Sequence, residues 1–240
     1  MKLAGNVALV TGSGRRMGRA IALAFAANGA NVVINAVSDR AAMQQTVADA
    51  RALGVRAIGC LADVRDRAAV DAMVTQARAE LAGPIDILVN CPAPRAEGPF
   101  ETLPFETWRE VMSIVLDGAF HCTQAVIPGM LEAGRGTILS ITGLGGQTGQ
   151  EHRAHVAAAK HGLAGMTKSL AMEYAARGIT VNAIAPTRIA GGASRASYEV
   201  TPVGRTGRQE EVAALCCFLA SEDARFITGQ TYAINGGTYI

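Results

Sequence analysis

The chain has 240 residues, of which 50% are hydrophobic and 18% are charged, and its formal net charge is +2 at pH 7. This composition supports a substantial hydrophobic core, excludes a disordered chain and fits one α/β domain over residues 1–240. Because the basic residues form no long run, we expect neither nucleic acid nor an anionic membrane as a partner. The expected ligand is a small-molecule substrate.

The cysteines and the N-terminal residues indicate the cellular compartment of the protein. The five cysteines are odd in number, lack C-x-x-C spacing and lie in apolar stretches, as expected of small buried side chains in a reducing compartment. Met1–Gly5 holds no long apolar signal core, and no later run reaches the ~18 apolar residues that span a bilayer. We therefore expect a cytoplasmic protein without a membrane segment.

The first elements are a strand, a glycine turn and a helix. Val7–Val10 is a run of four apolar residues and predicts a buried strand. Gly12 and Gly18 permit a tight turn, and apolar residues then recur at helical spacing. The backbone N–H groups and positive dipole end of such a helix suit a phosphate. The turn is either a pyrophosphate cradle or an ordinary strand-to-helix turn, and two glycines alone do not decide between them.

The rest of the chain alternates strand and helix patterns. Apolar runs predict further strands over Asn31–Asn35, Val55–Leu61, Ile85–Val89, Gly136–Thr142, Ile179–Ile184 and Gly229–Ile234. Helical periodicity predicts helices over Asp39–Leu53, Arg65–Leu81, Phe105–Leu131, Ala154–Ala176 and Gln209–Ser221. This alternation predicts an α/β fold, a Rossmann-like doubly wound parallel sheet of about seven strands with ligands beyond their carboxyl ends.

Motifs along this pattern resemble those of the short-chain dehydrogenase/reductase family over nearly the whole chain. They are Thr11–Gly18, Ala62–Val64, Val89–Asn90, Trp108, Lys160, Val181–Pro186, Thr228–Gln230 and Asn235–Gly237. The resemblance implies an oxidoreductase with a nicotinamide dinucleotide and a small-molecule substrate. It implies that Asp63 and Val64 hold the adenine, that Asn90 supports the ribose region and that Lys160 reaches the nicotinamide ribose. The other implied cofactor contacts are Gly12, Ser13, Arg15, Arg16, Met17 and Gly18 in the glycine turn, and Pro186.

The chain departs from this family where the family keeps its proton-transfer groups. The resemblance places the family's catalytic Tyr at Val156, four residues before Lys160. It places the family's Ser at Gly143, and the Asn of its long helix at Val115. Loss of a general acid costs about 10²–10⁴-fold in rate, so we expect poor reduction of ordinary ketones.

The cofactor positions also differ from the family pattern. Arg16 stands where the family has its middle glycine, as in members similar to pteridine reductases. Ala36 ends the second strand without the Asp that accepts the ribose 2′-hydroxyl in NAD-selective members, and Arg15 offers a cation for a 2′-phosphate. The sequence therefore favours NADP(H), with NAD(H) as the alternative, unless the two arginines are solvated surface charges.

Replacement proton-transfer groups lie just before the Lys160 helix. His155 neighbours the vacated Tyr position, and with Lys160 and Thr142 it forms the predicted catalytic set. Consecutive helical residues point about 100° apart, so His155 faces the pocket, solvent or a partner subunit. His152, His155 and Glu151 lack a further clustered donor, and we predict no metal site.

Three functional hypotheses follow from these residues. The first is an atypical NADP(H)-dependent oxidoreductase, acting on C=N or activated C=C bonds. The second is a lyase or isomerase that uses His155 and Lys160 on the same scaffold. The third is a non-catalytic, nucleotide-binding partner of an active homologue. The apolar faces of Phe105–Leu131 and Ala154–Ala176 predict assembly into a homodimer or homotetramer, as the resemblance also implies.

Overall fold

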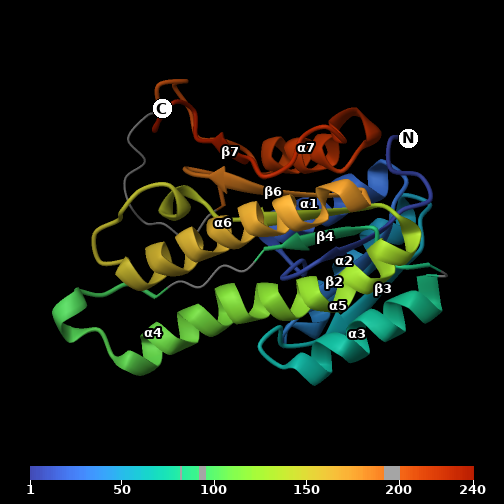
Figure 1. Cartoon of the computed structure of the whole chain (residues 1–240), viewed down its shortest axis with the longest axis horizontal. Helices are drawn as coiled ribbons and strands as arrows, with labels where there is room; N and C mark the ends of the chain where they lie inside the picture. Colours follow the sequence, from blue (N-terminus) through green and yellow to red (C-terminus); the bar gives the residue numbers. More distant parts are fainter. Residues whose placement is uncertain (82, 92–95, 192–200) are drawn as a thin grey trace.

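The protein is built on one sheet of seven parallel strands (Figure 1). The computed structural model describes residues 1–81, 83–91, 96–191 and 201–240. The strands lie in the order β3-β2-β1-β4-β5-β6-β7. They are β1 (Val7–Val10), β2 (Asn31–Ala36), β3 (Ala57–Leu61), β4 (Ile87–Asn90), β5 (Gly136–Ile141), β6 (Ile179–Pro186) and β7 (Thr231–Ile234). The predicted parallel α/β fold is thus confirmed.

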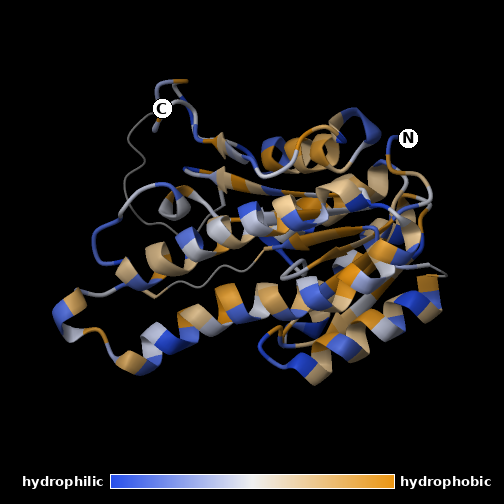
Figure 2. Ribbon diagram, viewed as in Figure 1, coloured by the Kyte–Doolittle hydropathy of each residue, from blue (hydrophilic) through white to orange (hydrophobic). Residues whose placement is uncertain are grey.

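Helices cover both faces of this sheet (Figure 1). One layer holds α1 (Arg16–Ala27), α2 (Arg40–Ala52) and α7 (Gln209–Leu219), and the other holds α3 (Arg67–Leu81), α4 (Phe105–Met112), α5 (Gly118–Ala133) and α6 (Ala154–Tyr174). Alternate residues of β1 serve the two layers, since Ala8 and Val10 belong to one buried cluster and Val7 and Leu9 to the other. Hydrophobic residues predominate along the strands, whereas the helices carry both hydrophobic and hydrophilic residues (Figure 2).

Most element boundaries agree with the sequence prediction within two residues. The strands β3, β4 and β7 begin two residues later than predicted, because pairing starts only where the neighbouring strand provides a partner, as at Val32↔Ala57. Short 3₁₀ turns lie at Phe100–Thr102, Leu144–Gly146, Ala175–Arg177 and Glu222–Ala224.

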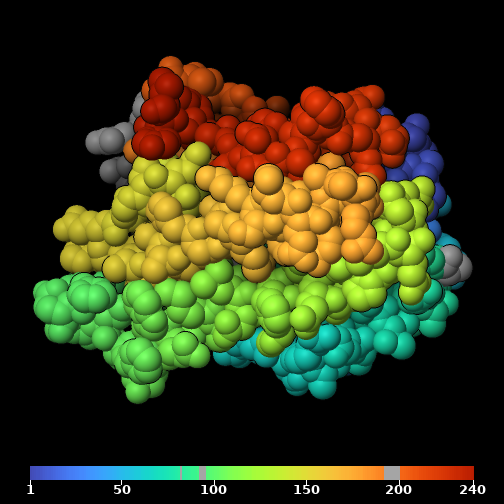
Figure 3. Space-filling model, viewed as in Figure 1, coloured from blue at the N-terminus to red at the C-terminus, as the bar shows by residue number. Residues whose placement is uncertain are grey.

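The long helix predicted over Phe105–Leu131 is interrupted. A π-helical turn, η2 (Ser113–Asp117), separates α4 from α5, so the helical register shifts around Val115. The stretch Phe105–Ala133 is long and apolar enough to cross a membrane by length and composition alone. In this fold α5 packs on β4 and β5, and its buried residues Cys122 and Val126 belong to the core. In the space-filling view α5 and α6 run side by side across one face (Figure 3).

The turn between β1 and α1 depends on two glycines. Gly12 has φ +61°, in the left-handed region that favours glycine. At Gly18 an added Cβ would lie 2.5 Å from the carbonyl oxygen of Gly12. The backbone of α1 therefore approaches the turn too closely for any side chain at that position.

We predict that Gly18→Ala lowers the free energy of unfolding by about 1–3 kcal/mol, because the methyl group would collide with backbone atoms that have no room to move. Denaturant unfolding followed by circular dichroism measures this. Gly165→Ala is the control, since that helical glycine has open space around it and alanine favours a helix. Equal stability of Gly18→Ala and the wild type would contradict the packing described above.

Candidate functional site

The carboxyl ends of the central strands bring the predicted site residues to one edge of the sheet. Val10 of β1 is paired with Val89 of β4, Asn90 with Ser140 of β5, and Ile141 with Ile184 of β6. Thr11, Cys91, Thr142 and Pro186 are the residues at or just beyond these strand ends. In parallel α/β sheets this edge is where ligands bind.

The turn at the start of α1 is held by hydrogen bonds from its neighbours. The Ser13 hydroxyl donates to the Val10 carbonyl at 2.6 Å, and the backbone N–H groups of Gly12 and Ser13 donate to Asn35. No side chain caps α1, whose first turn also has no acidic residue. The helix start thus keeps backbone N–H groups and a positive dipole end for an anion, and the residues fit a cofactor pyrophosphate.

Two arginines stand at this turn. Arg15 and Arg16 are exposed, and Arg16 has φ +54°, an uncommon conformation for a residue with a side chain. Arg15 lies 3.4 Å from a carboxylate oxygen of Asp39, whose other oxygen caps α2 by accepting from the Ala42 N–H. Ala36 ends β2 without a polar side chain. An exposed ion pair of this kind contributes little energy, so Arg15 can exchange Asp39 for a phosphate.

The residues expected at the adenine and ribose lie along the same edge. Asp63 forms an ion pair with Arg65 at 2.6 Å, and this hydrogen-bonded guanidinium lowers the pKa of the Asp63 carboxyl. The carbonyl of the next residue, Val64, is 3.0 Å from Nδ1 of His121. Asn90 is buried at the end of β4, with its side-chain amide donating to the Thr123 hydroxyl at 3.3 Å.

Lys160 projects from α6 toward the end of β5. Its ammonium group donates to the carbonyl of Ile141 at 2.6 Å, and its side chain is buried. Burial lowers the pKa of Lys160 to about 8, and burial raises that of the nearby Cys91 thiol to about 11. Cys91 is therefore a protonated, buried thiol at neutral pH, as are the other four cysteines, which are free and buried as the sequence predicted.

The hydroxyl of Thr142 points back to the sheet. It donates to the Ile184 carbonyl at 3.2 Å, and the Thr142 backbone N–H donates to the same oxygen. Gly143, which follows it, has φ +70° and ψ 178°, a conformation that a serine would adopt only with strain. The predicted catalytic role of Thr142 stays a prediction.

Val115 and Val156 pack together in one apolar cluster. These are the positions at which the family's Asn and Tyr were expected, on η2 and on the first turn of α6. Their neighbours in the cluster are Val111, Ala119, Ala159 and Leu163, with Ala96, Met112, Leu116 and Met166 at its edge. The space between α4, η2 and α6 is thus filled by hydrocarbon.

His155 is fully buried and does not face solvent. Its Nε2 lies 3.1 Å from the carbonyl oxygen of Ala96 and, because a carbonyl only accepts, Nε2 carries the proton. Two further contacts join the same segments: the Gly98 N–H donates to the His152 carbonyl, and Arg153 forms an ion pair with Glu97. Nothing in the sequence indicates that residues 96–98 and 152–155 meet, so sequence reasoning missed this connection.

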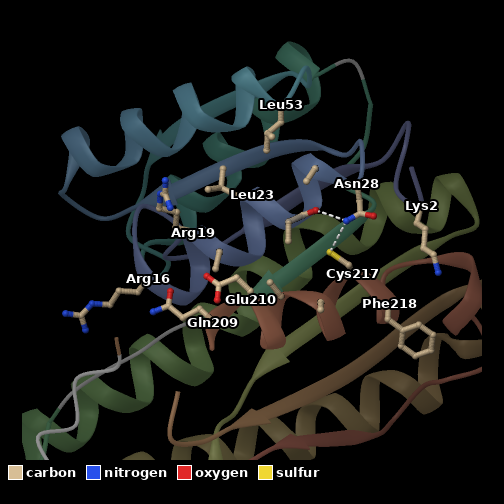
Figure 4. A pocket seen from close by; sticks show the side chains of 15 residues that line it. Lys2, Arg16, Arg19, Leu23, Asn28, Leu53, Gln209, Glu210, Cys217 and Phe218 are labelled. Atoms are coloured by element: carbon tan, nitrogen blue, oxygen red, sulfur yellow. Dashed lines mark hydrogen bonds between the residues drawn. The ribbon is translucent and has the colours of Figure 1, made fainter. Parts of the chain in front are cut away.

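A cavity lies elsewhere, between α1 and α7 (Figure 4). It has a volume of about 720 Å³, a floor of small residues from both helices, and Arg16 at one end. Arg19 at its rim is paired with Asp49. This groove is on the α1 and α7 layer, whereas Lys160 is on α6 in the opposite layer.

Because the pKa of buried Lys160 falls from 10.5 to about 8 on folding, the unfolded chain holds more protons than the folded chain between these pH values. We predict that the unfolding free energy of the wild type rises relative to Lys160→Met by roughly 3 kcal/mol between pH 8 and 10.5. Urea unfolding of both proteins across this range measures the difference. A difference independent of pH would mean that Lys160 is well solvated.

Comparisons with known proteins agree with this geometry. The profile of the family described as Enoyl-(Acyl carrier protein) reductase matches residues 12–239. The 3-oxoacyl-(acyl-carrier-protein) reductase FabG of Escherichia coli strain K12 is 38% identical over the full length of both chains, and FabG of Staphylococcus aureus strain Mu50 is 36% identical over 97% of this chain and 98% of its own.

Two crystal structures are also similar. A short-chain type dehydrogenase/reductase from Mycobacterium marinum is 30% identical, with a TM-score of 0.92 over 99% of this chain and 96% of its own. A protein from Sinorhizobium meliloti 1021 is 34% identical, with a TM-score of 0.93 over 99% of this chain and 97% of its own. The chain therefore belongs to the short-chain dehydrogenase/reductase family of nicotinamide-dependent oxidoreductases.

Proposed function

We propose that this protein is an NADP(H)-dependent oxidoreductase that reduces a C=N or an activated C=C bond of a small molecule without a tyrosine proton donor. The proposal rests on a contrast between the cofactor side of the site and the proton-donor positions. The uncapped start of α1 and the buried Lys160 suit a dinucleotide, whereas Val115 and Val156 fill the proton-donor positions with hydrocarbon.

The side of the site that holds the cofactor has the groups that a dinucleotide needs. The start of α1 would receive the pyrophosphate, with Arg16 above it and Arg15 beside the 2′-phosphate. Asp63 and Val64 would flank the adenine, and Lys160 would exchange the Ile141 carbonyl for the ribose hydroxyls. When bound, the reduced nicotinamide supplies a hydride to the substrate.

Among the described residues, the positions where the family's proton-transfer groups were expected, Val115, Gly143 and Val156, carry no hydrogen-bond donor side chain. The Thr142 hydroxyl is held by the Ile184 carbonyl, and no side chain projects from Gly143. Without a positioned acid and an oxyanion donor, a ketone would lose several orders of magnitude in rate. The names of the bacterial relatives describe reduction of a 3-oxoacyl carbonyl. That reaction therefore suits this chain less well than reduction of a bond that accepts a hydride without an external acid.

We also propose a cytoplasmic homodimer or homotetramer. Large apolar side chains remain exposed on α4 and α5, among them Phe105 and Phe120. They lie in the layer that α6 shares, so pairing of these helices with a second copy would bury them.

We predict that Arg15→Ala weakens NADPH binding about tenfold or more and leaves NADH binding nearly unchanged, because only NADPH has the 2′-phosphate that pairs with this guanidinium. Isothermal titration calorimetry with both cofactors measures this. Arg109→Ala, which removes an exposed arginine on α4, is the control. Tighter binding of NADH than NADPH by the wild type would exclude NADP(H) selectivity, and binding of neither would favour a protein without cofactor chemistry.

We predict that Val156→Tyr raises NADPH-dependent reduction of simple ketones by about tenfold or more, because it returns a hydroxyl to the expected acid position. Val156→Phe is the matched control, since it has the same ring without the hydroxyl and reports any effect of bulk in the apolar cluster. Absorbance of NADPH gives the rate. Rapid ketone reduction by the wild type, with no gain in the Tyr variant, would show that the acid lies elsewhere.

A further inference from the structure

The hydrogen-bond donors around the end of β5 and the start of α6 are directed at backbone carbonyls. Thr142 donates to the Ile184 carbonyl, Lys160 to that of Ile141, and His155 through Nε2 to that of Ala96. These three side chains are the predicted catalytic set. All three are more than nine-tenths buried.

Two buried side-chain atoms in the segment from Gln147 to His155 have no hydrogen-bond partner, and both are acceptors. Among the described residues, the only buried side-chain N or O atoms without a hydrogen-bond partner are Nδ1 of His155 and Oε1 of Gln147. Because Nε2 of His155 carries the proton, Nδ1 of the neutral ring holds a lone pair. Gln147 lies between β5 and α6, directly after the turn Leu144–Gly146. An unmade buried hydrogen bond is costly, so a ligand that brings a donor here gains the energy of that bond.

We propose that the substrate is a protonated imine, and that the amide oxygen of Gln147 accepts a hydrogen bond from its N–H⁺ group. This inference rests on the proposed function and names its substrate class. His155 acts as a positioning residue, because its Nε2 holds residue 96 against α6.

The chemistry balances without a protein acid. The carbon of a C=N–H⁺ group accepts a hydride from the reduced nicotinamide, a C–H bond forms, and the π electrons move to nitrogen. Nitrogen already holds its proton, so the product is a neutral amine and the oxidised cofactor. No further proton is needed, which agrees with hydrocarbon at Val115 and Val156.

Charge complementarity favours this cation over a carbonyl compound. Reduction of a carbonyl places negative charge on oxygen, which the unpaired amide oxygen of Gln147 would oppose, whereas an iminium nitrogen offers it a donor. Lys160 is the nearby cation, and with cofactor bound its ammonium would be directed to the ribose hydroxyls in place of the Ile141 carbonyl.

The decisive experiment compares two ring compounds of the same shape by calorimetry, each titrated into the protein saturated with NADP⁺. They are 2-iminopiperidine, which is a cationic N–H donor at neutral pH, and 2-piperidone, its neutral lactam. We expect the amidinium to bind at least about ten times more tightly. Equal binding, or tighter binding of the lactam, would overturn the inference.

Substitutions at one position test the acceptor itself. Gln147→Met should remove most of the preference for the amidinium, and Gln147→Glu should increase it, because a carboxylate is a stronger acceptor for a cation. Gln150→Met, in the same connection between β5 and α6, should leave the preference unchanged. An amidinium preference that persists unaltered in both Gln147 variants would show that this residue is not the acceptor.

Turnover separates failure of this inference from failure of the proposed function. With NADPH, we expect the cyclic imine 1-pyrroline to be reduced faster than cyclohexenone by the wild type. Reduction of cyclohexenone without reduction of 1-pyrroline would agree with the proposed oxidoreductase activity but would overturn the inference that the substrate is an imine. If the protein does not bind NADPH, both the proposed function and the inference that rests on it are wrong.

Discussion

The pairing of β1 with β4 is the contact on which the site depends, because it joins the two halves of the sheet. Thr11 reinforces it beyond the strand ends: its hydroxyl donates to the Val89 carbonyl at 3.3 Å and accepts from the Cys91 N–H at 2.9 Å. This side chain therefore links the glycine turn of the first half to the loop that follows β4. A shift of β1 relative to β4 would separate the start of α1 from Lys160, although neither of them takes part in the pairing of these two strands.

The site is built on a frame that the chain shares with its relatives. The relatives keep the same fold over nearly the whole chain, and the TM-scores above 0.9 mean that few backbone positions have moved. In this chain the side chains around α6 send their donors into the backbone and leave two acceptors unpaired. The start of α1 and the side chains around α6 are thus separate groups of residues on one frame.

At the start of α6, an apolar cluster lies beside a buried side chain that is hydrogen-bonded to the backbone. Val156 contributes to a cluster with Val115, and the adjacent His155 is buried one position earlier on the same turn. A buried imidazole is tolerated here because the Ala96 carbonyl accepts its Nε2 proton. The contacts of residues 96–98 with residues 152–155 then hold residues 96–98 against the start of α6.

The fold class and the order of its elements could be predicted from the sequence, because apolar runs of strand length alternate with helical periodicity in a pattern that only a covered parallel sheet can bury. The sequence also pointed to the glycine turn and Lys160, whose roles depend on local motifs. Three features could not be predicted and are seen only in the folded chain: His155 is buried, Val115 and Val156 belong to one cluster, and the Thr142 hydroxyl donates to β6. Each of these facts arises from contacts between segments far apart in the chain, and no local pattern of residues encodes such contacts.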